Sequence, residues 1–344
     1  MAGLTSFSEV PNIDIAPLFG ADPAAKAAVA GELAGAASDI GFMYVSGTGI
    51  DERVFAELLG AAKRFFAGSL ETKMRTYIGN STNHRGYVPE GEEVFAGMSA
   101  DRKEAFDLCR DLPADDPDYL AGNPLLGPNQ WPDLPGFEDA VADYYQQVFD
   151  VGVALMRAFA VAIGEAEDFF DRHVTKPPSQ LRLIHYPFDE SAEDRPGIGA
   201  HTDYECLTLL RGTAPGLEVL NGAGRWIDVP PVPGAYVVNI GDMLELLTNG
   251  RFVATTHRVR KVAQERYAFP LFFTVDYDTV VAPLPAFVDA DTPARPALRA
   301  GEHLFAQTAQ SFRYLRTRMA DGTLVLPEGS VELSSFGHTA VQPA

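Results

Sequence analysis

The chain has 344 residues, of which 46% are hydrophobic and 22% are charged, so it is long and apolar enough to bury a sizeable core. Its formal net charge of −20 disfavours nucleic acids and anionic membranes as partners, because their negative charges would be repelled. No apolar run approaches the roughly 20 residues that span a membrane, and Cys109 and Cys206 are too few for a disulfide framework. The N-terminus lacks the basic start and apolar run of a signal peptide, so we expect a cytoplasmic protein.

The first third of the chain predicts an α/β section. Residues 8–20 indicate a short strand and turn, the alanine-rich residues 23–38 a helix, and residues 41–47 a buried strand that ends at glycine. Apolar side chains recur at helical spacing over residues 51–67, which predicts a second helix. Residues 79–136 are rich in Gly, Pro, Asn and Asp, and their interspersed apolar side chains favour an ordered, packed connection.

The rest of the chain predicts a long helix followed by an all-β core. Apolar residues at every third or fourth position make residues 137–164 the strongest helix signal. Residues 180–275 hold several short β-rich runs separated by turn residues, which is typical of a sandwich or barrel. Residues 302–319 predict a final helix. We therefore predict a mainly β protein with flanking helices, whose core is a double-stranded β-helix, or jelly roll, behind an α/β N-terminal section.

His201 and Asp203 are candidate metal ligands, because alternate side chains of an extended strand point to the same face. A third ligand must come from elsewhere, and His257 lies in another β-rich run. Two histidines and one carboxylate leave open positions on a metal, an arrangement typical of non-haem iron(II) oxygenases. The His-x-Asp pair alone is a weak signal, since a single histidine in a strand is more often a hydrogen-bonded core residue.

Arg266 follows His257 near the start of the next β-rich run. A hairpin between the two runs would bring its guanidinium back toward the metal pocket. Arginine presents a fixed fork of donors that binds a carboxylate in bidentate fashion and stays charged. The alternative is an ordinary surface arginine at a turn.

Together these segments resemble a known enzyme family over nearly the whole chain and in the same order. The chain resembles the isopenicillin N synthase-like branch of the 2-oxoglutarate/Fe(II) dioxygenases. The resemblance rests on GIGAHTDYECLTLL (197–210), residues 216–259, ERYAFPLFF (265–273), PNIDIAPL (11–18), GFMYVSG (41–47), RGYVPEGEE (85–93) and GPNQWP (127–132).

The resemblance implies an enzyme that uses Fe(II), 2-oxoglutarate as co-substrate and O2. It assigns His201, Asp203 and His257 as the catalytic iron ligands, and Arg266 as the residue that grips the distal carboxylate of 2-oxoglutarate. Many members add a serine hydroxyl two residues after this arginine, where this chain has Ala268. A further contact often comes from a stretch that here reads LRLIHYP (181–187), so Arg182 or His185 is expected to compensate.

Residues 85–97 resemble the loop that covers the metal in this branch. The resemblance makes candidate substrate contacts of Tyr87, Glu92, Glu93, Val94 and Phe95. Glu92 or Glu93 would meet a cationic amine; the alternative for both is a solvated surface position. Tyr204 and Phe272 are further candidates for substrate contact, with packing in the core as their alternative role.

The same resemblance divides one integrated unit into residues 8–125, an N-terminal α/β region, residues 126–178, a connecting segment and long helix, residues 179–280, the catalytic jelly roll, and residues 281–344, a C-terminal helix and tail. The expected function is oxidation, above all hydroxylation, of a small amino-acid-like or natural-product substrate. The alternatives are an iron oxidase that does not use 2-oxoglutarate, an enzyme that fragments 2-oxoglutarate, and a non-enzymatic jelly-roll binding protein. The sequence does not specify the oligomeric state.

Overall fold

The computed structural model describes residues 4–94, 103–188, 198–260 and 264–330, in which two β-sheets face each other. The larger sheet has eight strands in the order β1-β2-β10-β7-β12-β5-β4-β3. These strands are β1 (Asn12–Asp14), β2 (Phe42–Ser46), β3 (Gly86–Val88), β4 (Glu104–Leu108), β5 (Gln180–Tyr186), β7 (Leu207–Gly212), β10 (Tyr236–Ile240) and β12 (Arg266–Phe273).

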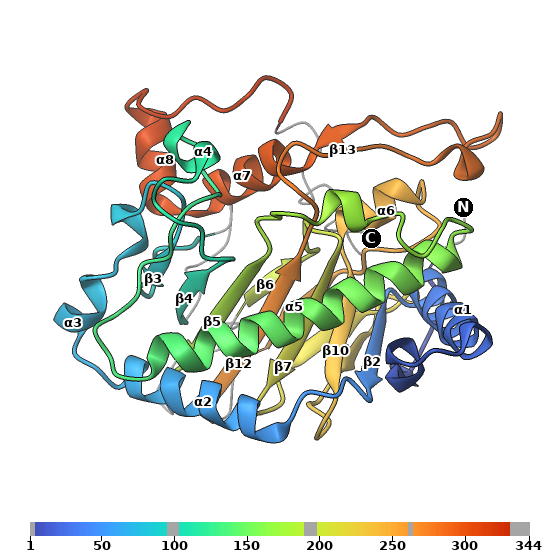
Figure 1. Cartoon of the computed structure of the whole chain (residues 1–344), viewed down its shortest axis with the longest axis horizontal. Coiled ribbons are helices and arrows are strands. Elements are labelled where there is room, and N and C mark those ends of the chain that lie inside the picture. Colours follow the sequence, from blue (N-terminus) through green and yellow to red (C-terminus); the bar gives the residue numbers. More distant parts are fainter. Residues whose placement is uncertain (1–3, 95–102, 189–197, 261–263, 331–344) are drawn as a thin grey trace.

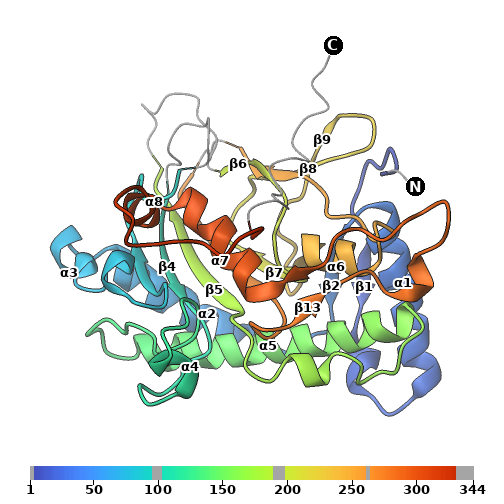
Figure 2. The same cartoon turned by 90° about the horizontal axis from the view of Figure 1, so that it is seen from above.

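The smaller sheet has four strands in the order β6-β11-β8-β9, and Figure 2 shows it on the opposite side of the larger sheet from helix α5. Its strands are β6 (Ile198–His201), β8 (Leu217–Leu220), β9 (Trp226–Asp228) and β11 (His257–Val259); β13 (Val280–Val281) pairs separately with β14 (Leu298–Arg299). Two facing sheets with helices outside them confirm the predicted mainly β fold with an α/β N-terminal section.

Three helices cover the outer face of the larger sheet: α1 (Pro23–Asp39), α2 (Glu52–Phe66) and α5 (Phe137–Ala162), which crosses the strands in Figure 1. The side chains of Asp22 and Asp51 cap α1 and α2 by accepting backbone N–H bonds from Ala24 and Arg53. Within the described residues, no helix combines the length and the apolar composition that crossing a membrane requires. The remaining short helices are α3 (Leu70–Met74), α4 (Pro117–Leu120), α6 (Asp242–Leu247), and the 3-10 helices η1 (Ala16–Phe19), η2 (Ile78–Asn80), η3 (Asp171–His173) and η4 (Pro285–Phe287).

A cavity lies between the two sheets, and the period of two along each strand decides which side chains line it. From β5 and β12 these are Gln180, Arg182, Ile184 and Tyr186, and Arg266, Ala268, Pro270 and Phe272. Their neighbours in the sequence, including Leu181, Leu183, Phe269 and Phe273, point to the helices and are fully buried in the core.

The single helix predicted over residues 302–319 is wrong, because the structure has two helices there. Helix α7 (Ala300–Ser311) and helix α8 (Arg313–Ala320) are separated by Phe312, whose backbone is extended at φ −86° and ψ 128°. The Phe312 ring packs edge-on against the His84 imidazole, with 4.6 Å between ring centroids, and lines the cavity. Apolar periodicity continues through this break, so the pattern alone does not show it.

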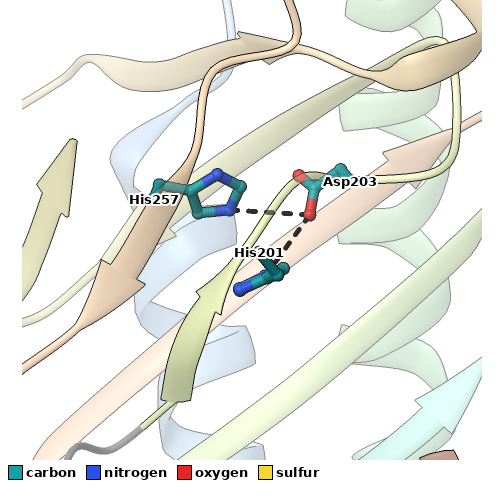
Figure 3. Close-up of side chains that lie close together, drawn as sticks. All are labelled: His201, Asp203 and His257. Atoms are coloured by element: carbon teal, nitrogen blue, oxygen red, sulfur yellow. Dashed lines mark ion pairs between the residues drawn. The ribbon is translucent and has the colours of Figure 1, made fainter. Parts of the chain in front are cut away.

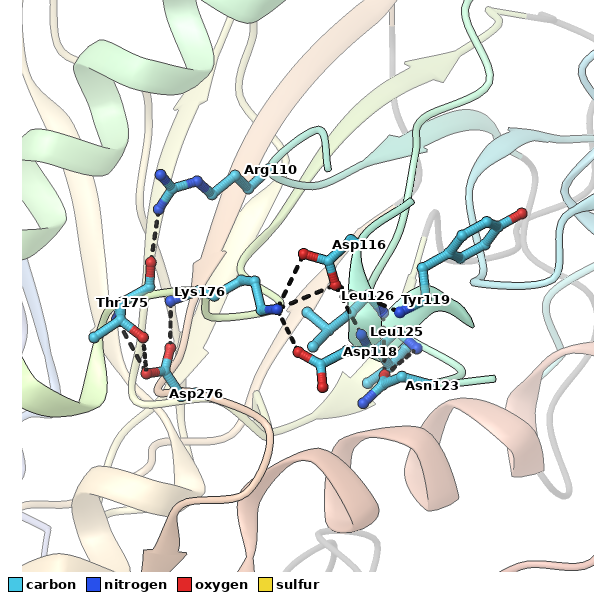
Figure 4. A network of polar contacts seen from close by, with 10 residues as sticks. All are labelled: Arg110, Asp116, Asp118, Tyr119, Asn123, Leu125, Leu126, Thr175, Lys176 and Asp276. Carbon is cyan, nitrogen blue, oxygen red and sulfur yellow. Dashed lines mark hydrogen bonds and ion pairs between the residues drawn. The ribbon is translucent and has the colours of Figure 1, made fainter. Parts of the chain in front are cut away.

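The predicted packed connection, residues 79–136, contains β3, β4 and α4 and is fixed to the barrel by polar contacts (Figure 4). Lys176 Nζ pairs with the carboxylates of Asp116 and Asp118, and its backbone N–H donates to Asp276 Oδ1 at 2.6 Å. Thr175 donates to the same Asp276 from its backbone and its hydroxyl. These bonds join the connection, the entrance to β5 and the exit from β12, the two strands that carry much of the cavity wall.

Candidate active site

His201, Asp203 and His257 converge at one point of the cavity (Figure 3). One ligand atom from each lies within 4.8 Å of the others, and Asp203 Oδ1 is 3.6 Å from His201 Nε2 and 3.5 Å from His257 Nε2. Asp203 and His257 are buried and His201 is nearly so. This is the donor set of the two-histidine, one-carboxylate iron site.

Both imidazoles are held in the tautomer that a metal needs. His201 Nδ1 lies 2.8 Å from the Gly199 carbonyl oxygen, and His257 Nδ1 lies 3.1 Å from that of Thr255. Because a carbonyl only accepts hydrogen bonds, each Nδ1 carries a proton, which leaves Nε2, on the side of Asp203, as the atom that can bind a metal. The His257 ring is also packed edge-on against Phe42 at 5.2 Å between centroids.

The Asp203 carboxylate is oriented by two neighbours on the larger sheet. Thr208 Oγ1 and Asn239 Nδ2, the latter at 2.7 Å, both donate to Oδ2 and leave Oδ1 facing the imidazoles. Burial alone would raise the pKa of Asp203, but the adjacent His257 and His201 and the Thr208 bond hold it below its ordinary value. Burial and the proximity of His257 lower the pKa of His201 to about 4, so that His201 is neutral at pH 7 and suited to bind a cation.

The three residues therefore converge as predicted, although Asp203 does not lie on the same strand as His201. His201 is the last residue of β6 and pairs with His257, the first of β11. Asp203 lies beyond the strand, in a turn that is held because its carbonyl accepts the Asp242 N–H at 2.8 Å. A Cβ at Gly241 would lie 2.2 Å from the Glu205 carbonyl oxygen, so only glycine allows the chain to pass here.

Arg266 reaches the same cavity from the facing sheet. The predicted hairpin is wrong, because β11 pairs with β6 and β8 whereas β12 pairs with β5 and β7. The Arg266 side chain is buried, its Nε donates to the Ala214 carbonyl at 3.1 Å, and its guanidinium stands 4.7 Å from the Tyr186 ring centroid. Within the described residues, Arg266 Nη1 and the Tyr186 hydroxyl are buried without a hydrogen-bond partner, so this end of the cavity suits an anion with several acceptor oxygens.

Comparison with known proteins agrees with this geometry. Residues 10–134 match the family model described as the N-terminal part of non-haem dioxygenases in morphine synthesis, and residues 177–275 match the 2OG-Fe(II) oxygenase superfamily. A 2-oxoglutarate-Fe(II) type oxidoreductase, hxnY of Emericella nidulans, is 34% identical over 314 residues, which cover 88% of this chain and 90% of the relative. The chain belongs to the 2OG-Fe(II) oxygenase superfamily.

Two further relatives of this oxygenase bear on its chemistry. A homoarginine-6-hydroxylase of Glycine max is 34% identical over 328 residues, covering 90% of this chain and 98% of the relative. The crystal structure of a full-length Neurospora crassa protein in complex with α-ketoglutarate and thymine superposes with a TM-score of 0.75 and 25% identity, covering 91% of this chain and 97% of that protein. The oxygenase is thus an Fe(II)- and 2-oxoglutarate-dependent oxidoreductase with a jelly-roll core that acts, with O2, on a small molecule.

The structure places neither Arg182 nor His185 beside Arg266. His185 points to the outer face of β5, where its ring stacks on Tyr267 at 4.7 Å between centroids and its two nitrogens contact Glu104 and Glu265. Arg182 faces the cavity, but its guanidinium is bound by Asp107 and Glu93. The residue that approaches Arg266 from β5 is Tyr186, its register partner on the neighbouring strand.

Of the candidates in the 85–97 loop, only Glu93 lines the cavity among the described residues. Tyr87 points to the outer face and donates to Glu104 at 2.6 Å, and Glu92 accepts bonds from Tyr77 and the Tyr314 backbone. The Val94 N–H donates to the Ser311 carbonyl, which ties the segment to α7, and Val94 is not part of the cavity wall. Phe95 lies outside the described residues. Tyr204 and Phe272, by contrast, do line the cavity.

Glu93 belongs to a buried group of charges on the cavity wall. Its carboxylate lies 3.0 Å from Arg182 Nη1 and 2.8 Å from Lys103 Nζ. Burial would raise the pKa of Glu93, but Arg182 and Lys103 outweigh it and hold that pKa far below the ordinary value. The solvated position considered for Glu93 is therefore wrong.

Two further buried polar residues of the cavity wall, His84 and Glu205, were not among the predicted site residues. His84 is fully buried, with Nδ1 2.7 Å from the Tyr314 hydroxyl and Nε2 unpartnered within the described residues. Burial, with Arg182 nearby, keeps the pKa of His84 well below its usual range, so the ring is neutral. Glu205 follows the metal motif and also has a buried carboxyl oxygen without a partner there. Neither residue stands in a periodic pattern that would have revealed it.

Proposed function

We propose that this oxygenase hydroxylates a small polar molecule that bears N–H or O–H groups, in the amino-acid-like or natural-product class. One observation carries the proposal: four polar side chains that line a single cavity keep buried atoms without partners among the described residues. These side chains are Arg266, Tyr186, His84 and Glu205. Buried polar groups are normally satisfied, so four together mark places where ligands bind.

In this proposal His201, Asp203 and His257 hold the iron, which supplies the oxidising chemistry with O2 and 2-oxoglutarate when bound. Arg266 and Tyr186 bind the distal carboxylate of 2-oxoglutarate, and the Tyr186 hydroxyl takes the place of the serine that Ala268 lacks. Ala268 lines the cavity without a polar group, so it leaves room for the co-substrate. We further assign the chain to the isopenicillin N synthase-like branch, which the match of the N-terminal dioxygenase model supports.

The substrate side is defined by His84 and Glu205. A carboxyl oxygen and an imidazole nitrogen that lack partners among the described residues match a molecule with groups that both donate and accept hydrogen bonds, such as an amine, amide or alcohol. Apolar walls from Ile184, Ile198 and Phe312 surround them and exclude water. That one relative is named for hydroxylating homoarginine supports an amino-acid-like substrate. The buried free thiols of Cys109 and Cys206 fit the reducing cytoplasm that we propose as its location.

The test measures succinate from the Fe(II)-loaded enzyme with a panel of amino acids and related amines, each paired with an analogue in which the amine is replaced by hydrogen. We expect coupled succinate formation only with donor-bearing compounds. Arg266→Ala should weaken 2-oxoglutarate binding by about 2–5 kcal/mol, since a buried charge pair loses one partner. Arg260→Ala, whose side chain is 42% exposed, is the matched control and should bind normally. Equal turnover of the donor-free analogues would contradict the substrate class, and unchanged 2-oxoglutarate affinity in Arg266→Ala would contradict the role of Arg266.

A further inference from the structure

A second cavity lies directly behind Arg266. It is formed by the end of β7 and the turn after it (212–214), the segment before β10 (231–235) and Phe55 of helix α2. Figure 1 shows α2 along one end of the strands, with α7 and α8 beyond the other end, where Phe312 lines the substrate side of the active-site cavity. The two cavities share three lining residues, Leu210, Leu217 and Arg266. These three side chains are therefore the wall between the cavities.

The wall is thin next to the guanidinium. A Cβ placed on Gly212 would lie 3.6 Å from Arg266 Nη2, and one placed on Gly216 would lie 3.7 Å from its Nε. Both positions are glycine, so neither places a side chain between the guanidinium and the turn that lines the second cavity. Arg266 Nε already donates to Ala214, a residue of that turn. The co-substrate arginine is thus approachable from two sides.

The second cavity is also positively charged. Among its described lining residues, Arg211 and Arg266 are the ionisable ones and none is acidic, although the whole chain carries a net charge of −20. The Arg211 guanidinium lies 4.0 Å from the Phe55 ring centroid and pairs with Glu52. The Glu52 side chain is 63% exposed, so an incoming carboxylate can take its place on Arg211 from solvent.

We propose that this cavity, lined by Arg211 and Arg266, is a passage for dicarboxylates, through which 2-oxoglutarate enters and succinate leaves. The proposal rests on the proposed role of Arg266 in gripping 2-oxoglutarate. The two arginines would draw a dianion inward, first to Arg211 on the cavity lining and then to Arg266 at the wall. Succinate would then leave without passing the bound organic substrate, which occupies the opposite mouth beside His84 and Phe312.

The decisive variant narrows the mouth without touching the co-substrate site. Val232 lines the second cavity and is 38% exposed, so Val232→Trp adds bulk there with little risk to folding. The readout is the visible charge-transfer absorbance that forms when Fe(II)-loaded enzyme is mixed with 2-oxoglutarate without oxygen, followed by stopped flow. A passage changes both rate constants by one factor, so Val232→Trp should slow association and dissociation alike, by roughly tenfold, and leave Kd unchanged.

A second variant should act in the opposite direction. Glu52→Gln removes the carboxylate that competes for Arg211, so association of 2-oxoglutarate should become several-fold faster at low salt, with a smaller difference at high salt. The control is Val280→Trp, because Val280 is 59% exposed on β13 and lies outside the second cavity. It should match the unmodified enzyme in both rate constants.

The outcomes separate this inference from the proposed function. Absence of the absorbance band in the unmodified enzyme would refute the co-substrate site itself. A normal band with rate constants that Val232→Trp and Glu52→Gln leave unaltered would refute the passage alone. If Val232→Trp associates normally but dissociates faster, its Kd for 2-oxoglutarate rises. That result would also refute the passage, because it indicates a distorted co-substrate site.

Discussion

Single residues decide how the iron ligands are oriented, and the hydrogen bonds that Asp203 accepts are an example. The two donors on Oδ2 fix the carboxylate so that Oδ1 alone faces the imidazoles. Partners of this kind typically change metal affinity by about 10–100-fold when lost. The protein therefore commits buried polar groups from β7 and β10 to a single oxygen atom.

Thr208→Val should lower the affinity for Fe(II) by about tenfold while leaving the fold intact, because valine fills the same volume without the hydroxyl. An anaerobic Fe(II) titration measures the change. Thr208→Ser, which keeps the hydroxyl, is the control and should bind iron almost normally. Equal affinities in the valine and serine variants would show that the hydroxyl does not orient Asp203.

At this scale, motif spacing predicted residues that share a local pattern and missed those whose orientation depends on another strand. His201, Asp203 and His257 could be assigned because the metal dictates their chemistry. Tyr186 could not, because only the pairing of Arg266 with Tyr186 decides which side chains of β5 face inward. The predicted residue, His185, is its neighbour in the sequence and points to the opposite face of the strand.

Buried ion pairs hold separate segments of the chain together, and those of Glu93 are an example. Its loop is held to β5 by Arg182 and to the residue before β4 by Lys103. The pKa of Glu93 is depressed in the folded protein. The ionised Glu93 therefore stabilises the fold at pH values above its ordinary pKa of 4.5, and this stabilisation is lost progressively as the pH falls below 4.5.

Glu93→Gln should therefore reduce the free energy of unfolding at pH 7 by about 3–5 kcal/mol, because the buried cations of Lys103 and Arg182 each lose a negatively charged contact. The difference from the unmodified protein should shrink between about pH 5 and pH 3.5, as Glu93 takes up a proton during unfolding. Urea titrations across this range measure it. Glu57→Gln, on an exposed face of α2, is the control; a pH-independent difference would contradict the charge argument.

Helix α5 packs so closely on the barrel that one of its glycines is required. A Cβ on Gly152 would lie 2.3 Å from Phe273 Cδ2, at the end of β12. Gly152→Ala should destabilise the protein by about 1–3 kcal/mol, because overpacking outweighs the better helix propensity of alanine. Gly31→Ala on α1, with open space around it, should instead stabilise by about 0.5–1 kcal/mol in the same thermal unfolding experiment. The reverse order of the two variants would refute this account.

The spacing of apolar residues predicted helices well where one face of the helix is buried, and poorly where the chain lines the cavity. The helices α1, α2 and α5 end within about two residues of their predicted bounds, as expected for amphipathic segments. The break at Phe312 was missed because the residue stays apolar while its backbone turns extended to face the cavity. The strand pairing of β11 and β12 was also missed, since neighbouring runs in a sequence often form a hairpin and here belong to different sheets.

For the molecule as a whole, Fe(II) and then 2-oxoglutarate should each raise the free energy of unfolding, the second ligand only after the first has bound. Fe(II) at about 100 times its Kd should contribute about 2.7 kcal/mol, and 2-oxoglutarate at a similar excess a comparable further amount. Asp203→Ala should lose both increments and Arg266→Ala only the second. Differential scanning calorimetry under argon measures each step. A full second increment in Arg266→Ala would place the co-substrate elsewhere.

The strand order has a practical consequence for any shortened form of this protein. Strand β10 lies between β7 and β2, so among the described strands its outer edge is covered by β2, in the N-terminal part of the chain (Figure 1). A fragment that began after β2 would expose the unpaired backbone of Tyr236–Ile240, an apolar edge that invites another copy to add a strand. The N-terminal residues thus act as a permanent cover against self-association, and a fragment limited to the iron-binding half should aggregate rather than fold alone.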